Sequence, residues 1–123
     1  MTETKLSHNS MQPTSLATRH CVPCEGGTAP LSATAEEMYL SATPAWQLNQ
    51  TTLHTISRDF EFKNFGETIK FVNKVAEIAE SEGHHPDILI HNYKHAQITL
   101  STHAIKGLSE NDFILAVKID ELL

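Results

Sequence analysis

One amphipathic stretch of the chain carries strong helix signals at both ends. Asn64 precedes Glu67 by three residues, the spacing of a helix N-cap with an acidic third position, and Gly83 suits a left-handed C-terminal residue. Residues 65–82 are therefore predicted to form a helix that buries one face. The apolar residues of that face are expected to be Phe65, Ile69, Val72, Ala76 and Ala79.

Segments on both sides of this helix alternate polar and apolar residues, as strands do. Strands are expected at 46–48, 53–62, 88–91 and 96–100. Two further helices are expected at about 34–43, before Pro44, and from Ser109 to about Leu122. The order α-β-β-α-β-β-α indicates an α+β fold, in which helices pack on one face of a four-stranded antiparallel sheet.

The length of 123 residues fits one domain. Residues 1–30 are polar and contain Gly and Pro, so we expect a mobile tail followed by an ordered domain at 31–123. Cys21 and Cys24 lie in this predicted tail. They are either a tail motif of unknown role in a reducing compartment, or a redox couple or half of a zinc site shared between subunits.

Composition limits the classes of partner. The chain has 9 Lys and Arg against 15 Asp and Glu, a net charge of −6, and no basic cluster, so nucleic acid is not expected as a ligand. It has neither a membrane-length apolar run nor a signal-peptide core, which favours the cytoplasm. The last helix is apolar almost all round, and a one-sided sheet leaves a face and edges uncovered; both favour a dimer or tetramer.

Histidines dominate the candidate chemistry, with 8 in the chain. His84 and His85 follow directly after the helix stop, and His103 lies just past a predicted strand. If the last two strands form a hairpin about Tyr93 and Lys94, the register returns His103 to the end of the sheet where His84 and His85 stand. Of the remaining histidines, His54, His91 and His95 are expected to be solvated strand or turn residues, and His8 and His20 lie in the predicted tail.

Two uses of three converging imidazoles compete. Three histidines can hold a catalytic zinc, but adjacent histidines on an extended segment point apart, and the chain has no HExxH helix. General acid–base catalysis needs only imidazoles that titrate near neutral pH. The residues favour acid–base catalysis without a metal.

The spacing of these residues resembles the signature of the pterin-4a-carbinolamine dehydratase family. The resemblance rests on Glu80, the triplet His84-His85-Pro86, Tyr93, His103 and Asp112. The flanking stretches "FKNFGETIKFVNKVAEIAE", "HHPDILIH", "ITLSTHA" and "GLSENDFILAVKID" are also similar to bacterial members. The resemblance covers roughly residues 21–122. One difference is that the "HNYKHAQ" turn is one residue longer than in animal members.

The resemblance implies a hydro-lyase that dehydrates 4a-hydroxytetrahydrobiopterin, or a related pterin, to a quinonoid dihydropterin and water. This reaction returns the pterin used by aromatic amino acid hydroxylases, so functional coupling to such an enzyme is implied. No metal or organic cofactor is implied, because the pterin is the substrate. Family members form dimers or tetramers. Two alternatives stay open: another pterin as substrate, or a non-catalytic binding, regulatory or assembly module on the same fold.

The resemblance also implies roles for individual residues. His84 and His103 would form the acid–base pair, and His85 would mainly hold the pterin. Glu80 and Asp112 would support the imidazoles from behind. The substrate pocket would be lined by Gly83, His84, His85, Ser101, Thr102, His103 and Ala104.

Overall fold

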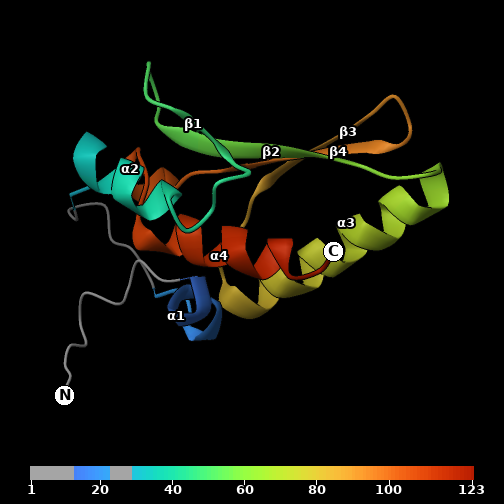
Figure 1. Ribbon diagram of the computed structural model, residues 1–123, viewed down its shortest axis with the longest axis horizontal. Coiled ribbons are helices and arrows are strands. Elements are labelled where there is room, and N and C mark those ends of the chain that lie inside the picture. Colours follow the sequence, from blue (N-terminus) through green and yellow to red (C-terminus); the bar gives the residue numbers. More distant parts are fainter. Residues whose placement is uncertain (1–12, 23–28) are drawn as a thin grey trace.

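A four-stranded antiparallel sheet with helices on one side organises the structure, a computed structural model that describes residues 13–22 and 29–123 (Figure 1). The helices are α1 (Pro13–Thr18), α2 (Ala33–Leu40), α3 (Phe65–Glu82), the short 3-10 helix η3 (His103–Ile105) and α4 (Glu110–Asp120). The strands are β1 (Gln47–Asn49), β2 (Thr55–Glu61), β3 (Asp87–His91) and β4 (His95–Leu100), in the spatial order β1-β2-β4-β3. The predicted α+β class is confirmed, and α1 is an additional element.

The strand register separates an apolar and a polar face, as the alternation predicts. Ile56 pairs with Leu100, and Phe60 pairs with Ala96; all four side chains are buried against the helices. Asp59 pairs with Gln97 between them, so these two side chains point to the opposite face. The face of the sheet turned away from the helices is therefore polar.

Helix α3 has the predicted ends, but its buried face agrees with the prediction only in part, at Ala79 and at Val72, which packs against the core. The Asn64 side chain accepts a hydrogen bond from the Glu67 N–H at 2.9 Å, as an N-cap does. The buried residues are Thr68, Phe71, Val75 and Ala79, whereas Phe65 is 53% exposed. The rings of Phe71 and Phe60 lie 4.6 Å apart, and this aromatic contact fixes the rotation of the helix about its axis.

The N-terminal segment corrects the prediction of a tail through residue 30. Residues 13–18 form α1, which packs on the side of α4 away from the sheet (Figure 1), and Leu16 is completely buried in the core. Cys24 lies outside the described residues. The apolar circumference of α4 is thus covered within one chain, so this feature no longer argues for a second subunit.

Polar contacts join the same segment to α3 and α4. Lys118 Nζ donates to the Ala17 carbonyl at 2.8 Å. The Glu82 carboxylate accepts the Cys21 N–H at 2.8 Å and meets the His20 ring at 3.0 Å. Burial by itself would raise the pKa of Glu82, but the hydrogen bonds from Cys21 and His20 and the charge of Lys118 outweigh it and hold that pKa below its ordinary value.

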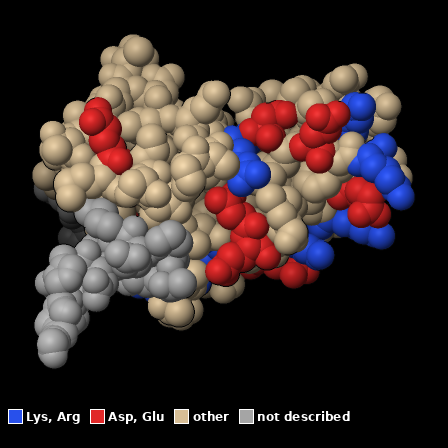
Figure 2. All heavy atoms as spheres, viewed as in Figure 1, with Lys and Arg blue, Asp and Glu red and all other residues tan. Residues whose placement is uncertain are grey.

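Charged side chains gather at one end of the molecule. Figure 2 shows Lys and Arg interspersed with Asp and Glu toward the end where α3 begins and the β3–β4 hairpin turns, with few charges over the other half of this face. Within the part of the chain that the structure describes, no helix is long and apolar enough to cross a membrane.

Truncation of Leu16 tests whether α1 belongs to the core. Leu16→Ala is expected to lower the free energy of unfolding by about 2–5 kcal/mol, because it leaves a cavity between α1 and α4. The matched control is Leu53→Ala at a side chain that is 41% exposed. Urea unfolding followed by circular dichroism measures both, and equal, small losses for the two variants would contradict the packing.

Replacement of Glu82 tests, through the pH dependence of stability, whether its carboxylate holds the N-terminal segment in place. Because the folded state lowers this pKa below 4.5, the ionised carboxylate stabilises the fold at pH above 4.5, and the effect disappears as the pH falls through the folded-state pKa. Glu82→Gln is therefore expected to be less stable than the native chain at pH 7 and equally stable near pH 2. Unfolding free energies across this range check the sign; a deficit that grows on acidification would contradict it.

Candidate functional site

The end of α3 places two histidines at a sharp change of chain direction. Gly83 adopts a left-handed conformation with φ 66°, its N–H bonds the Glu80 carbonyl at 3.3 Å, and the His84 N–H bonds the Ala79 carbonyl at 3.2 Å. This pair of bonds is a Schellman motif, the usual glycine-dependent helix end. His84 and His85 therefore leave the helix abruptly before β3 begins.

The loop after β4 supplies the opposite wall. Thr102 N–H donates to the Gly107 carbonyl at 2.7 Å, and Gly107 N–H donates back at 3.4 Å, which closes the loop. His103 begins η3 inside this closed loop, and Lys106 ends it with φ 55°. The register Asp87↔Thr99 brings the start of β3 beside the end of β4, so both walls stand at the same end of the sheet, as the hairpin arithmetic predicts.

A pocket of about 370 Å³ lies between these walls, within the size range of small-molecule sites. All seven residues named as pocket lining from the sequence line it, together with Val22 and Asn111. The lining residues are Val22, Gly83, His84, His85, Ser101, Thr102, His103, Ala104 and Asn111.

Asp112 lies behind His84 and is fully buried. Its Oδ1 accepts from His84 Nε2 at 2.6 Å, and its Oδ2 accepts from the Thr102 hydroxyl at 2.8 Å and the Ser109 N–H at 3.0 Å. The His84 side chain is 12% exposed. A buried carboxylate that accepts a hydrogen bond from Nε2–H fixes the ring tautomer and leaves Nδ1 as the second functional nitrogen.

The other two pocket histidines are held less firmly. His85 Nε2 bonds Glu80 Oε2 at 2.6 Å, but both side chains are largely exposed. Among the described residues, the exposed His103 ring has no hydrogen-bond partner. The three imidazoles thus meet on one pocket with different supports: a buried carboxylate, an exposed carboxylate and none.

Val22 and Asn111 are pocket residues that the sequence did not reveal. The Asn111 side chain pairs with the backbone of Val22: Oδ1 accepts its N–H at 3.0 Å, and Nδ2 donates to its carbonyl at 2.6 Å. The sequence could have indicated Asn111 as a pocket residue, because it is adjacent to Asp112. It could not have indicated Val22, because the place of Val22 depends on the packing of α1 on α4.

Cys21 is a poor nucleophile in this structure. Its thiol is half-buried and contacts the Asn111 carbonyl at 3.6 Å. Burial, followed by the nearby charges of Glu82 and Asp112, raises the pKa of Cys21 to about 12. Since the thiolate is the reactive and metal-binding form, this environment disfavours both uses for Cys21.

Three histidines outside the pocket are partly exposed, as expected, but each contacts a carboxylate that the sequence does not predict. His54 Nδ1 contacts both oxygens of the fully buried Glu36, at 2.9 and 2.8 Å. His91 ends β3, as expected, His95 begins β4 rather than lying in the turn, and both bond Asp59 on β2. Burial alone would raise the pKa of Asp59, but these hydrogen bonds outweigh it and lower that pKa.

The fold and pocket define a small α+β protein whose histidines meet at one end of its sheet, where proton transfer to a small molecule is possible. The family model for pterin 4 alpha carbinolamine dehydratase matches residues 29–122, and the chain belongs to this family. A relative in Halorhodospira halophila is 49% identical over 88% of this chain and 97% of its own, and one in Methylococcus capsulatus is 45% identical over 91% and 96%. Both are named as pterin-4-alpha-carbinolamine dehydratases, with the activity given as a provisional assignment.

Solved structures extend the comparison. A protein from Brucella melitensis, described as a transcriptional coactivator/pterin dehydratase, has a TM-score of 0.70 and 30% identity, covering 76% of this chain and 97% of that one. A pterin dehydratase-like protein described as a RuBisCO assembly factor in the alpha-carboxysome has a TM-score of 0.54 and 25% identity, covering 63% and 88%. The same fold therefore occurs under names that describe catalytic and non-catalytic roles.

Substitution of Gly83 tests the turn that positions the pocket histidines. A Cβ at this position would meet no neighbouring atom within 4 Å, so the cost of Gly83→Ala is the strain of φ 66° alone. We expect a loss of about 1–2 kcal/mol in unfolding free energy. Gly83→Asn, which tolerates the left-handed region better, should lose less in the same urea titration; equal losses for both variants would contradict a backbone origin.

Proposed function

We propose that this protein is a hydro-lyase that dehydrates 4a-hydroxytetrahydrobiopterin, or a related 4a-hydroxytetrahydropterin, to a quinonoid dihydropterin and water. The observation that carries the proposal is the pocket shared by His84, His85 and His103, in which a buried carboxylate orients His84. Family membership supports the substrate class.

The elimination requires two proton transfers. A base takes the proton from ring nitrogen N5 of the substrate, and the C4a–O bond breaks as the C4a=N5 double bond forms. An acid protonates the departing hydroxyl, which leaves as water. The reaction is redox-neutral and needs no co-reactant, so imidazoles suffice as the protein's contribution.

The supports of the imidazoles suggest how the protein divides these tasks. Because Asp112 accepts a hydrogen bond from the Nε2–H of His84, the neutral ring offers Nδ1 as an acceptor, and His84 is suited to receive the N5 proton. His103, with its exposed ring, is suited to protonate the hydroxyl. His85, backed by the exposed Glu80, would hold the pterin ring rather than exchange protons.

The proposal includes the setting of the reaction. The substrate must come from an enzyme that hydroxylates with a tetrahydropterin, so we propose functional coupling to an aromatic amino acid hydroxylase. We also propose that the protein acts as a homo-oligomer in the cytoplasm, with the unpaired sheet edges β1 and β3 as candidate contacts.

A non-catalytic binding or assembly role is the second candidate. One structural neighbour, described as a RuBisCO assembly factor, has the same fold and is called dehydratase-like. A purely structural role, however, gives no chemical reason for three imidazoles on one pocket with a buried carboxylate behind one of them. The pocket therefore favours catalysis.

Stopped-flow absorbance of 4a-hydroxytetrahydropterin decay, with the substrate made in situ by a hydroxylase, tests the proposal. We expect the native chain to accelerate the decay, and His84→Ala and His103→Ala each to lower the rate constant by about 10²–10⁴-fold. Asp112→Asn should lower kcat with little change in KM, since it disturbs the orientation of His84 rather than contact with the pterin.

His20→Ala is the matched control, because this ring also contacts a carboxylate but is 80% exposed and lies outside the pocket lining. It should retain native activity. Losses below threefold for both His84→Ala and His103→Ala would reject the assigned pair. A folded native chain that leaves the decay unchanged would reject dehydration of that pterin and favour the binding or assembly role.

A further inference from the structure

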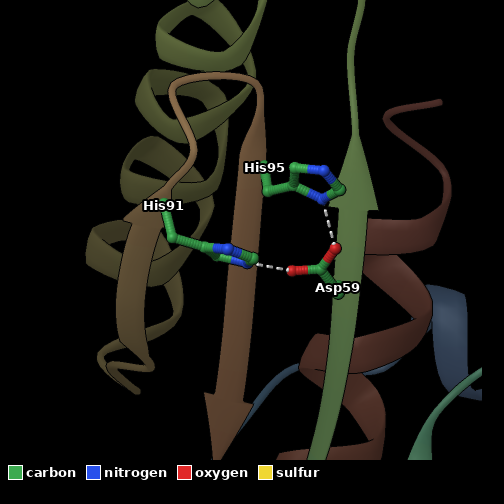
Figure 3. Close-up of side chains that lie close together, drawn as sticks. All are labelled: Asp59, His91 and His95. Carbon is green, nitrogen blue, oxygen red and sulfur yellow. Dashed lines mark hydrogen bonds and ion pairs between the residues drawn. The ribbon is translucent and has the colours of Figure 1, made fainter.

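Three side chains converge on the polar face of the sheet, far from the pocket. Figure 3 shows His91 on β3 and His95 on β4 directed toward Asp59 on the neighbouring strand β2. His91 Nε2 lies 2.6 Å from Asp59 Oδ1, and His95 Nδ1 lies 2.7 Å from Asp59 Oδ2. The two imidazoles are stacked, with ring centroids 4.9 Å apart.

We propose that Asp59, His91 and His95 form a binding site for a zinc-like divalent transition-metal ion. One ligand atom from each residue lies within 4.8 Å of the other two. Bonds of about 2.0–2.2 Å to zinc place the ligand atoms roughly three to four ångströms apart. The Asp59 carboxylate must therefore move slightly away from the two ring nitrogens, and the two imidazoles must move slightly toward each other. All three side chains are partly exposed, which permits this adjustment.

The strand register holds the three ligands in place. His91 and His95 are paired directly across β3 and β4, and Asp59 lies one diagonal step from His95 on β2. Residues in these positions share one face of the sheet at neighbouring distances. A metal ion here would join the edge strand β3 to β2 across β4.

A second carboxylate faces the outer nitrogen of one ligand. Glu61 Oε2 lies 4.0 Å from His95 Nε2, the ring nitrogen that does not face Asp59, and Lys94 lies 3.4 Å from the same oxygen. Metal-binding histidines commonly direct their second N–H to a carboxylate, which orients the ring. Glu61 is placed to do this when Nδ1 binds the metal.

The donor set selects the class of ion. Two imidazole nitrogens and one carboxylate oxygen suit zinc and other late first-row ions, whereas Mg²⁺ and Ca²⁺ prefer all-oxygen sites. The site is independent of the proposed dehydration, because His95 begins β4 and the pocket residue Ser101 follows directly after the other end of that strand.

Long-range ¹H–¹⁵N correlation spectra of the histidine rings test the site on the full metal-free chain. Addition of ZnCl₂ is expected to shift the rings of His91 and His95 together, with signals assigned through His91→Gln and His95→Gln. Excess MgCl₂ should leave them unchanged. A zinc titration followed on these two rings measures this site separately from the thiols and the pocket.

Matched variants decide the outcome. Asp59→Asn should abolish the coupled shift, and Glu61→Gln should weaken zinc binding by about 10–100-fold. His20→Ala removes another imidazole that contacts a carboxylate through Nδ1, and it should leave binding at the cluster unchanged. Zinc-induced shifts confined to other histidines, absence of any shift, or native affinity in Asp59→Asn would each overturn the proposal. None of these readouts involves a pterin, so failure of the dehydratase proposal is separately visible.

Discussion

The hydrogen bonds accepted by the buried Asp112 carboxylate are the interactions on which both the fold and the pocket depend. A carboxylate without exposure is costly unless hydrogen bonds replace its lost hydration. Asp112 obtains them from His84 at the end of α3, Thr102 after β4 and Ser109 at the start of α4. Its place in the first turn of α4 is favourable for negative charge. The end of α3 is thereby held to the loop after β4 and the start of α4 at one point, which is the back wall of the pocket.

The N-terminal segment completes this arrangement from the outside. Leu16 fills the core beside α4, and Asn111 pairs with the backbone of Val22 at the pocket rim. The same packing explains why α4 is apolar nearly all round without reference to a second subunit. Because Asn111 and Asp112 are adjacent, the first turn of α4 holds both Val22 at the pocket rim and His84, the proposed base.

Local chemistry made much of the fold predictable. Gly83 and Asn64 mark the ends of α3 because helix termini need particular backbone angles and side-chain acceptors. The hairpin register follows from strand alternation, and it correctly brings His84, His85 and His103 to one pocket. The buried face of α3 was not predictable in this way, because two apolar stripes compete and the aromatic contact of Phe71 with Phe60 decides between them.

The sequence by itself determined the ends of α3, the strand parity, the family resemblance and the set of histidines on the pocket, since each depends on spacing along the chain. Only the tertiary structure decided that Leu16 belongs to the core, that Val22 lines the pocket and that Asp59 meets His91 and His95. These contacts join residues far apart in the chain, and they depend on packing and strand pairing. No local pattern of residues encodes them.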